Sequence, residues 1–547
     1  MAEQERDDSG GLVRLLPVRA TPPSLNDNTG DWERLQRAVE RDLGAAAASL
    51  VVPWRRAAAV AAAFRENGFA GVAVLNEEPG RLELVDLLPA MPACLPVMAL
   101  DLGTTHLEAV LLDLVSGREL ARATRKNSQL EFGEDILSRI HFATVESGLQ
   151  RLQQAVLADI NALAAQLAAA AACQPATIRA LAVAGNTAMG HFLLGFDPYH
   201  LCREPYIPQV NDPPPVAAAE LGLAIHPAAP VRVLPGVGAY FGGDLLAGIV
   251  ACDLDLAAEP TMLIDVGTNA EVVVGCRDWL VACAGAAGPA LEGGVAKMGL
   301  RAGPGVVERV KIAADTGEIA CQIIAAADGS VPPAKGICGS GMIDLLAELF
   351  KTGMVDIRGK LQAERLGHNL WQTPDGPAVV VVPAGEAADG EPVVVSQLDI
   401  DALMRSKAAM YAILGTLMEQ VGLPFTELGR IHVAGAFGRH IDPQQAVTIG
   451  MIPDLPLAVY QPLGNSSLAG AQRYLREAAV RRRIGEVARK ITYIELNVNH
   501  DFMIRFSGSR FIPHTDRSLF PSVPYQLPGR EASDHDNSNP APTVNDD

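Results

Sequence analysis

The sequence predicts an α/β protein with two similar lobes, preceded by a small α+β domain. Two stretches, residues 97–113 and 261–275, share one pattern: an apolar strand that ends in aspartate, a glycine turn and a second apolar strand. Their aspartates, Asp101 and Asp265, lie 265 − 101 = 164 residues apart, which favours an internal duplication over a short repeat. The chain of 547 residues is also too long for one hydrophobic core.

Composition and charge exclude several classes of function. The formal net charge of −19 argues against nucleic acid as the main partner, because neutralising phosphates requires clustered lysine and arginine. The N-terminus, MAEQERDDSG, has neither the basic start nor the apolar core of a signal peptide. The longest run of low charge, residues 155–172, contains polar side chains and is interpreted as a soluble helix. We therefore expect a cytoplasmic protein that contacts no membrane.

The eight cysteines are scattered along the chain and form no metal-binding pattern. The closest pair, Cys276 and Cys283, is seven residues apart, so no CxxC motif occurs. We expect reduced and mostly buried thiols, and no iron–sulfur cluster in this chain.

The first 94 residues precede any chemistry-bearing motif. Residues 1–30 are polar and rich in proline, and we expect them to be flexible. Residues 31–94 are predicted to form linker helices and a small α+β middle domain. Its helices are expected from Asp31 to about Gly44 and over residues 54–66, and its two strands in GFAGVAVLN and RLELVDLLP.

The first lobe is predicted over residues 95–250 and contains the first aspartate loop. Asp101 ends a buried strand and is followed by Gly103, Thr104 and Thr105. A carboxylate at that position can hold Mg²⁺ through water, while the turn offers backbone N–H groups and two hydroxyls to phosphates. An ordinary β-hairpin explains one such loop equally well. The second copy favours the phosphate-binding interpretation.

The second lobe is predicted over residues 251–515, with an insertion of short strands at about 356–396 and a disordered acidic tail over 516–547. Its aspartate loop, in which Asp265 would again hold Mg²⁺ through water, adds a further set of candidate cofactor-binding residues. These are Gly267, Thr268 and Asn269.

Asp244 is the third candidate catalytic carboxylate. It stands alone on a helix of small residues, which would let two helices approach closely, as at a hinge. One interpretation is a favourable charge at a helix N-terminus and nothing more. Beside two phosphate loops, it becomes a candidate for orienting the attacking water.

Two glycine-rich segments complete the candidate nucleotide site. Gly339, Ser340 and Gly341 open a helix, where backbone N–H groups suit an anion or a closely approaching ligand. Gly435 and Gly438 follow an apolar strand and could accept an adenine ring or a ribose. No Walker A motif occurs anywhere in the chain.

Five segments, in this order, resemble the signature motifs of the acetate/sugar kinase–heat-shock chaperone–actin (ASKHA) superfamily. They are phosphate-1 (Asp101–Thr105), connect-1 (Gly238–Ala247), phosphate-2 (Asp265–Asn269), adenosine (Val433–Gly438) and connect-2 (Gly464–Ala471). The resemblance implies a duplicated ribonuclease-H-like fold, with two lobes that bind ATP and Mg²⁺.

Longer segments resemble one family within that superfamily, the reductive activators of corrinoid enzymes. They are FGEDILSRI, AGNTAMGHFLLG, LIDVGTNAEVVVG, GICGSGMID and VAGAFGRHIDP, and the similarity covers nearly all of residues 95–515. PPSLNDNTGDWERL resembles that family's linker, and residues 60–93 its middle domain. The resemblance implies ATP-driven reduction of inactive cobalt(II) to cobalt(I) in the corrinoid protein of a methyltransferase system.

The resemblance also implies roles for individual residues. Asp101 and Asp265 would position Mg²⁺-ATP, and Asp244 would orient the attacking water. The residues around the phosphates would be Thr104, Thr105, Thr268 and Asn269.

This chain departs from the family pattern at its start. Typical members begin with a ferredoxin domain, and this chain begins where that domain would end. We therefore expect a separate ferredoxin or another reductant to supply the electron, while the question of a homodimer stays open. Two alternatives remain as well: a small-molecule kinase of the same superfamily, and a non-catalytic nucleotide-dependent interaction protein.

Overall fold

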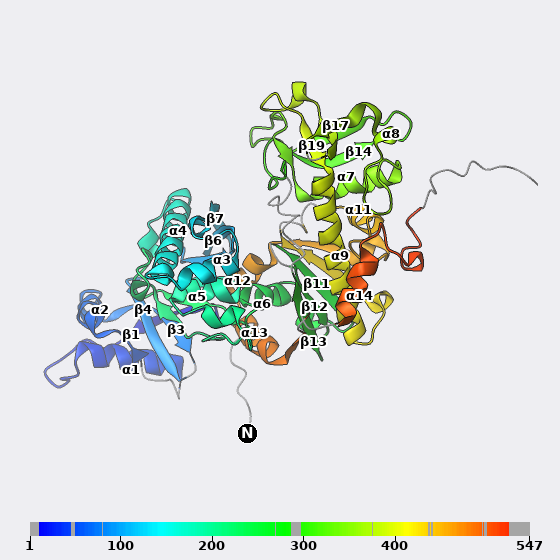
Figure 1. The fold of residues 1–547 in the computed structure, drawn as a ribbon. Coiled ribbons are helices and arrows are strands. Elements are labelled where there is room, and N and C mark those ends of the chain that lie inside the picture. The colour runs from blue at the N-terminus through cyan, green and yellow to red at the C-terminus, as the bar shows by residue number, and fades with distance from the viewer. Residues whose placement is uncertain are drawn as a thin grey trace, which may run out of the picture. The chain divides into compact units, whose positions relative to one another are not determined.

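The computed structural model of the chain describes residues 10–524 with short gaps (Figure 1). The gaps are residues 45–49, 79, 268–269, 286–296, 375, 436–437, 439–440, 495 and 497–499. The chain forms two compact units. Unit 1 comprises Met1–Pro289, Ala412–His440 and Leu455–Met503, and unit 2 comprises Ala290–Tyr411, Ile441–Asp454 and Ile504–Asp547.

Unit 1 begins with the expected small α+β domain. Its elements are β1 (Val13–Arg19), α1 (Asp31–Leu43), β2 (Leu50–Val51), α2 (Trp54–Glu66), β3 (Ala70–Glu78) and β4 (Arg81–Leu88). The sheet order is β1-β3-β4-β2, and Leu35 and Phe64 from the two helices are fully buried. The predicted flexibility of residues 1–30 is wrong for β1. This strand pairs antiparallel with β3 along its whole length and buries Val13, Leu16 and Val18.

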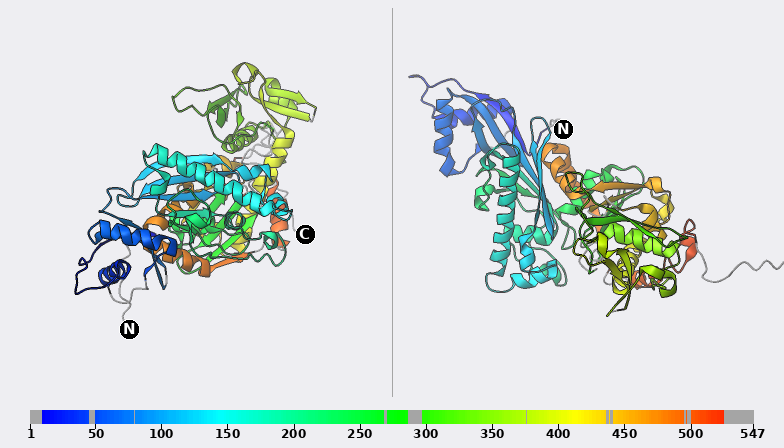
Figure 2. Two further views of the ribbon diagram at one scale, coloured as in Figure 1. Left: turned by 90° about the vertical axis from the view of Figure 1, so that its left-hand side faces the viewer. Right: turned by 90° about the horizontal axis from the view of Figure 1, so that it is seen from above.

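A six-stranded sheet follows in the first lobe. Its strands are β5 (Pro96–Leu102), β6 (His106–Asp113), β7 (Glu119–Lys126), β8 (Leu181–Gly185), β9 (Val216–Ala217) and β10 (Pro230–Val233). The helices are α3 (Ile136–Ala143), α4 (Gly148–Ala170), α5 (Thr187–Leu194) and α6 (Gly243–Ala251). The sheet order is β7-β6-β5-β8-β10-β9, and α4 packs against β6 and β7 (Figure 2).

A second six-stranded sheet occupies the other half of unit 1. Its strands are β11 (Thr261–Val266), β12 (Ala270–Gly275), β13 (Leu280–Gly285), β20 (Arg430–Ala434), β21 (Tyr460–Gly464) and β22 (Ile491–Ile494). The helices described in full in this half are α9 (Gln397–Gln420), whose first part lies in unit 2, α12 (Ser466–Arg476) and α13 (Ala478–Lys490). The sheet order is β21-β20-β11-β12-β13-β22.

The two sheets share one topology. In each, a three-stranded antiparallel meander continues into two parallel strands, in the orders β7-β6-β5-β8-β10 and β13-β12-β11-β20-β21. Asp101 pairs with Glu108 on the antiparallel side and Ala184 on the parallel side. Asp265 pairs with Glu271 and Ala434 in the same way. The duplicated two-lobed α/β fold is therefore confirmed, with the two aspartates at equivalent positions.

Unit 2 contains two small sheets, with orders β15-β14-β16 and β17-β18-β19. The strands are β14 (Val306–Ile312), β15 (Ile319–Ile323), β16 (Gly336–Ile337), β17 (Leu370–Thr373), β18 (Gly376–Val382) and β19 (Val393–Ser396). The helices are α7 (Gly339–Lys351), α8 (Ala363–Leu366), α11 (Pro443–Thr448) and α14 (His500–Ser509), the last of which begins in unit 1. Strands β17 to β19 lie in the predicted insertion.

The predicted disordered tail begins too early. Residues 516–524 are ordered: Phe520 is 2% exposed, and its ring lies 5.1 Å from that of Tyr411. The Ser522 amide also donates to Asp454 at 2.7 Å. A buried aromatic side chain and hydrogen bonds to Asp454 therefore hold a segment whose composition indicates disorder.

Helices α6 and α12 of unit 1 cross in close contact, as their small residues predict. A Cβ added at Gly470 would clash with the Ala247 carbonyl, and one at Gly248 would lie 3.0 Å from the Ser466 hydroxyl. The crossing therefore has room for glycine and for little else at these positions.

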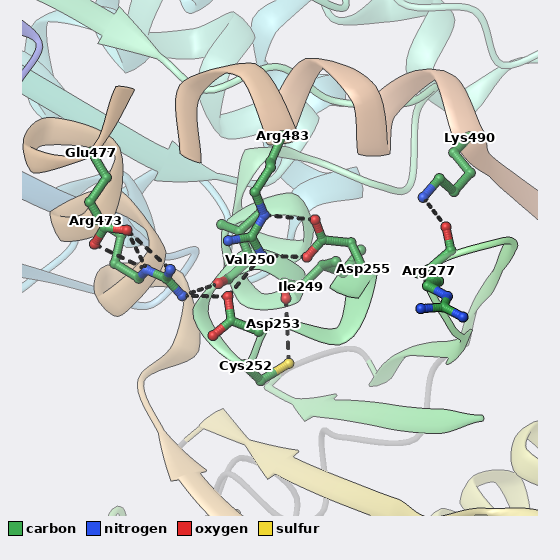
Figure 3. Close-up of polar contacts among 10 residues, drawn as sticks. All are labelled: Ile249, Val250, Cys252, Asp253, Asp255, Arg277, Arg473, Glu477, Arg483 and Lys490. Atoms are coloured by element: carbon green, nitrogen blue, oxygen red, sulfur yellow. Dashed lines mark hydrogen bonds and ion pairs between the residues drawn. The ribbon is translucent and has the colours of Figure 1, made fainter. Parts of the chain in front are cut away.

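Charged side chains fasten the C-terminal end of α6 to α12 and α13 (Figure 3). Arg473 donates to the Val250 carbonyl at 2.6 Å and to Asp253 at 2.9 Å. Arg483 donates to Asp253 at 2.8 Å and holds both oxygens of Asp255, at 2.6 and 2.8 Å. Asp253 thus bridges two arginines, and the helix crossing is held at a second point.

No helix in the described part of the chain is both long and apolar enough to span a lipid bilayer.

The Gly470 contact predicts a specific loss of stability. We expect Gly470→Ala to lower the free energy of unfolding by about 1–3 kcal/mol, because the added methyl overpacks the crossing. Urea denaturation measures the change. The matched control is Gly485→Ala on α13, where the nearest atom to an added Cβ is 3.6 Å away and alanine should gain up to about 1 kcal/mol. Equal effects of the two substitutions would contradict the prediction.

Asp344 on α7 predicts a pH-dependent stability. Burial raises the pKa of this carboxyl to about 6, although Arg309 and the Val310 amide act to lower it. Because the folded pKa lies above the unfolded value, the folded protein binds more protons between about pH 4 and 6, and its stability falls as pH rises through that range. We therefore expect Asp344→Asn to stabilise the protein at pH 7.5 by about 1–3 kcal/mol relative to its effect at pH 4.5. An effect in urea denaturation that is the same at both pH values would disprove this.

Candidate functional site

Asp101 lies near the end of β5, between β6 and β8, where the strand leaves the sheet. Both of its carboxylate oxygens accept hydrogen bonds from the start of α12. Ser467 Oγ donates to Oδ1 at 2.8 Å, and Asn465 Nδ2 donates to Oδ2 at 2.8 Å. A first-lobe carboxylate is thus bound by a helix from the second half of the chain.

Asp265 occupies the equivalent position on β11 and is held by the same helix. Ser466 Oγ donates to its Oδ2 at 3.0 Å. On its other side lies Gly435, which has a φ of +80° and at which a Cβ would lie 2.9 Å from Asp265 Oδ1 and 2.5 Å from the Val266 carbonyl. Two features therefore require glycine at position 435: its left-handed backbone conformation, and the lack of space for a Cβ beside the Asp265 carboxylate.

Asn465 organises this end of α12. Its Oδ1 caps the helix by accepting from the Leu468 amide at 2.8 Å. Its Nδ2 donates to Asp101 and also to Glu108, at 2.8 Å each. The sequence analysis identified residues 464–471 by their resemblance to the connect-2 motif, and it missed the polar roles of Asn465, Ser466 and Ser467. The available signal was an Asn-Ser-Ser cap directly after an apolar strand.

Asp244 lies in the first turn of α6, where its Oδ1 accepts from the Leu245 amide at 2.9 Å. Burial raises its pKa to about 7, and the negative charges of Asp101 and Asp265 act in the same direction. Burial likewise raises the pKa of Asp101 to about 6, against the hydrogen bonds from Ser467 and Asn465. The structure thus brings the three predicted carboxylates close enough to disfavour one another's ionisation.

This arrangement fits a divalent cation bound through its waters. A cation would relieve the repulsion among Asp101, Asp244 and Asp265, whose oxygens are the donors that Mg²⁺ prefers. In the described ranges, no three His, Cys, Asp or Glu side chains form a group that could hold a metal directly. Mg²⁺ that keeps its waters needs only one or two carboxylates.

The loop at Gly103–Thr105 is held by side chains from outside the loop. Asn186 Nδ2 donates to Thr104 Oγ1 at 3.1 Å, which orients that hydroxyl. Asn127 donates to the Gly103 carbonyl through Nδ2 at 3.0 Å and to the Thr105 carbonyl through its backbone N–H at 2.9 Å. A Cβ at Gly103 would clash with the His106 carbonyl, so the turn needs glycine there.

Arg139 on α3 is the most deeply buried of these supports. It is fully buried and donates to the carbonyls of Thr104 at 2.7 Å and Gly133 at 2.9 Å, and to Gln129 Oε1 at 3.3 Å. Burial lowers its pKa to about 10, so it stays protonated near neutral pH. Sequence reasoning missed this role, although Arg139 lies in the FGEDILSRI segment that carried the family resemblance.

Four other predicted residues of unit 1 are less defined, namely Gly267, Thr268, Asn269 and Gly438. Gly267 ends the described part of the second loop, and Thr268 and Asn269 lie outside the described residues. A Cβ at Gly438 would clash with the Val433 carbonyl, so this glycine is explained by the turn after β20. Their contacts with phosphates, adenine or ribose stay predictions.

Gly339, Ser340 and Gly341 belong to unit 2, at the start of α7. Ser340 Oγ donates to the Glu308 carbonyl at 3.3 Å, and a Cβ at Gly341 would lie 2.7 Å from the Val307 carbonyl. Close packing of α7 on β14 accounts for these contacts. Nucleotide binding by the three residues stays a prediction.

Comparison with protein-family models divides the chain into three regions. Residues 10–91 match the RACo linker region, residues 97–257 the RACo middle region, and residues 259–524 the C-terminal domain of RACo, the ASKHA domain. The family's middle region therefore corresponds to the first lobe of this chain. The small α+β domain, whose residues 60–93 were predicted to resemble the middle domain, corresponds instead to the linker region.

Individual relatives agree with these regions. The corrinoid activation enzyme RamQ of Eubacterium limosum is 30% identical over 430 residues, which are 77% of this chain and 71% of that protein. A [Co(II) methylated amine-specific corrinoid protein] reductase of Methanosarcina barkeri is 26% identical over 277 residues, 48% of this chain and 47% of that protein.

A solved structure matches almost the whole chain. It is a reductive activator for corrinoid, iron–sulfur protein, with 36% sequence identity and a TM-score of 0.86, and the match covers 96% of this chain and 82% of that one. With the paired aspartates of the two lobes and all three regional matches, the chain belongs to the RACo family of reductive activators of corrinoid proteins.

Proposed function

We propose that this chain is an ATP-dependent reductive activator that restores cobalt(I) in the corrinoid protein of a methyltransferase system. The observation that carries the proposal is the pair of carboxylates, Asp101 and Asp265, at equivalent positions of two duplicated sheets and joined by one helix. Family membership supplies the substrate class. The electron comes from a separate ferredoxin or another reductant.

The nucleotide would bind at the two aspartate loops. Asp101 and Asp265 would hold Mg²⁺ through its waters, and bound Mg²⁺ supplies positive charge against the phosphates. Backbone N–H groups of the Gly103 turn would face the phosphate oxygens. The hydroxyl and amide groups around them would be those of Thr104, Thr105, Thr268 and Asn269.

Asp244 is suited to orient the attacking water and to accept its proton. A general base works best when its pKa lies near the operating pH, and burial raises the pKa of Asp244 to about 7. Its position in the first turn of α6 fixes the carboxylate through the Leu245 amide. ATP hydrolysis would then supply the free energy for a reduction that is uphill for physiological donors.

The test is phosphate release from ATP, with and without a corrinoid protein from a methyltransferase system, combined with absorption spectroscopy of cobalt(I). We expect phosphate release that rises with the corrinoid protein, and cobalt(I) formation that depends on both ATP and a low-potential reductant. A small-molecule kinase would instead transfer the phosphoryl group to a metabolite. A rate of phosphate release that is the same with and without the corrinoid protein would count against the proposal.

Asp265 provides the sharpest catalytic prediction. We expect Asp265→Asn to lower the rate of ATP turnover by about 100-fold or more, because a neutral amide no longer attracts Mg²⁺. Asp278→Asn is the matched control, since Asp278 is highly exposed in the same half of unit 1 and lies 3.9 Å from Arg277. ATP turnover by Asp265→Asn at the wild-type rate would refute the carboxylate site.

Arg139 predicts a loss of both stability and nucleotide affinity. Arg139→Met leaves the Thr104 and Gly133 carbonyls without their donor, and we expect a loss of about 3 kcal/mol in the free energy of unfolding. The freed loop should also weaken ATP binding in calorimetry. Arg151→Met is the control, because Arg151 is exposed and lies over the Phe132 ring. Unchanged ATP affinity in a folded Arg139→Met protein would show that the loop does not depend on this arginine.

A further inference from the structure

Helix α12 contacts the candidate nucleotide site at one end and the N-terminal segment at the other. Its first residues and their cap, Asn465 to Ser467, donate to both loop carboxylates. With 11 residues the helix is about 16 Å long, at 1.5 Å per residue. Both ends belong to unit 1, so these contacts lie within one compact body.

At the far end, residues 10–12 are bonded directly to the last turn of α12. The Leu12 amide donates to the Leu475 carbonyl at 2.7 Å, and Leu12 is only 4% exposed. A Cβ at Gly11 would lie 2.8 Å from the same carbonyl and 2.7 Å from the Leu114 side chain. The segment therefore lies tightly against the helix, and it continues into β1 of the small domain.

Arg481 on α13 fastens the same junction. Its Nη2 donates to the Gly10 carbonyl at 2.9 Å and its Nη1 to the Tyr474 carbonyl at 3.3 Å. One guanidinium thus joins the N-terminal segment to the C-terminal turn of α12. Because each contact uses a backbone carbonyl, a shift of α12 along its axis would pull on residues 10–12 themselves.

The middle of α12 packs closely against α6. Gly470 packs against the Ala247 carbonyl, and Arg473 donates to the Val250 carbonyl. Asp244, the candidate water-orienting residue, lies at the start of α6. A displacement of α12 would therefore be shared with the carboxylate that acts on the water.

We propose that α12 couples nucleotide binding to the N-terminal segment, with Asn465, Ser466 and Ser467 as positioning residues that sense the nucleotide. This inference rests on the proposed function. The waters of Mg²⁺ would donate to the carboxylate oxygens of Asp101 and Asp265 that already accept from these three side chains. Because the Mg²⁺ waters and the α12 side chains would share the same carboxylate oxygens as acceptors, the position of α12 would depend on the bound nucleotide. The packed helix would transmit this shift to residues 10–12 and β1.

The experiment is hydrogen–deuterium exchange of the peptide containing residues 10–19, with and without Mg²⁺ and a non-hydrolysable ATP analogue. Calorimetry measures binding of the analogue separately. In the wild-type protein we expect at least a fivefold change in the exchange rate of the Leu12 amide. The Ser466→Ala/Ser467→Ala double variant, measured at analogue concentrations that calorimetry shows to saturate it, should show less than half of that change.

Arg481→Met tests the coupling from the far end. Arg481 is outside the nucleotide site, so we expect the affinity for the analogue to stay within twofold of wild type, while the exchange response at Leu12 is lost. Arg489→Met is the control, because Arg489 is exposed on the same helix, and it should keep both affinity and response. Comparison of Arg481→Met with Arg489→Met tests the coupling even if the double serine variant fails to fold.

The outcomes separate the two proposals. Failure of the wild-type protein to bind the analogue would refute the proposed function. Normal binding with no change in exchange at residues 10–12 would overturn the coupling alone. A wild-type response in the folded double variant, or in Arg481→Met, would overturn it as well.

Discussion

The interaction on which unit 1 depends is the set of hydrogen bonds from the N-terminus of α12 to two aspartates. Burial raises the pKa of Asp101, and the nearby negative charge of Asp265 acts in the same direction, so the Asp101 carboxylate is costly to ionise. Ser467, Asn465 and Ser466 supply donors, and the helix N-terminus adds partial positive charge. To deliver these groups, α12 must cross α6 closely, which is why glycine is needed at the crossing.

Duplication produced two lobes with equal topology and unequal loops. Both aspartates occupy the same position in matching strands, yet their surroundings differ. The first loop is held by polar side chains, Asn127, Asn186 and Arg139, that reach it from outside. The second carboxylate is instead approached by the backbone of Gly435. Equal folds therefore leave room for separate roles of the two lobes.

The sequence predicted what local patterns determine and missed what distant residues determine. Repeated strand–aspartate–glycine stretches predicted both loops and the duplicated fold, because strand periodicity is local. Asn465 and Asp101 are 364 residues apart, so no local pattern predicts their hydrogen bond. The polar composition of residues 1–30 and 516–547 predicted flexible segments, and the sequence analysis therefore missed β1 and the buried Phe520. A few buried side chains can order a segment whose average composition is polar.

The two kinds of support in the site differ in how they respond to charge. Arg139 holds the Thr104 carbonyl, an uncharged acceptor, and keeps its proton with a pKa of about 10. A nearby phosphate or Mg²⁺ would therefore change this contact less than a contact to a carboxylate. The donors of α12 contact carboxylates, whose strength as acceptors changes with any nearby cation. The proposed function needs both properties: a fixed support for the loop at which the nucleotide would bind, and a contact that would respond when it binds. Arg139 is suited to the first role and α12 to the second.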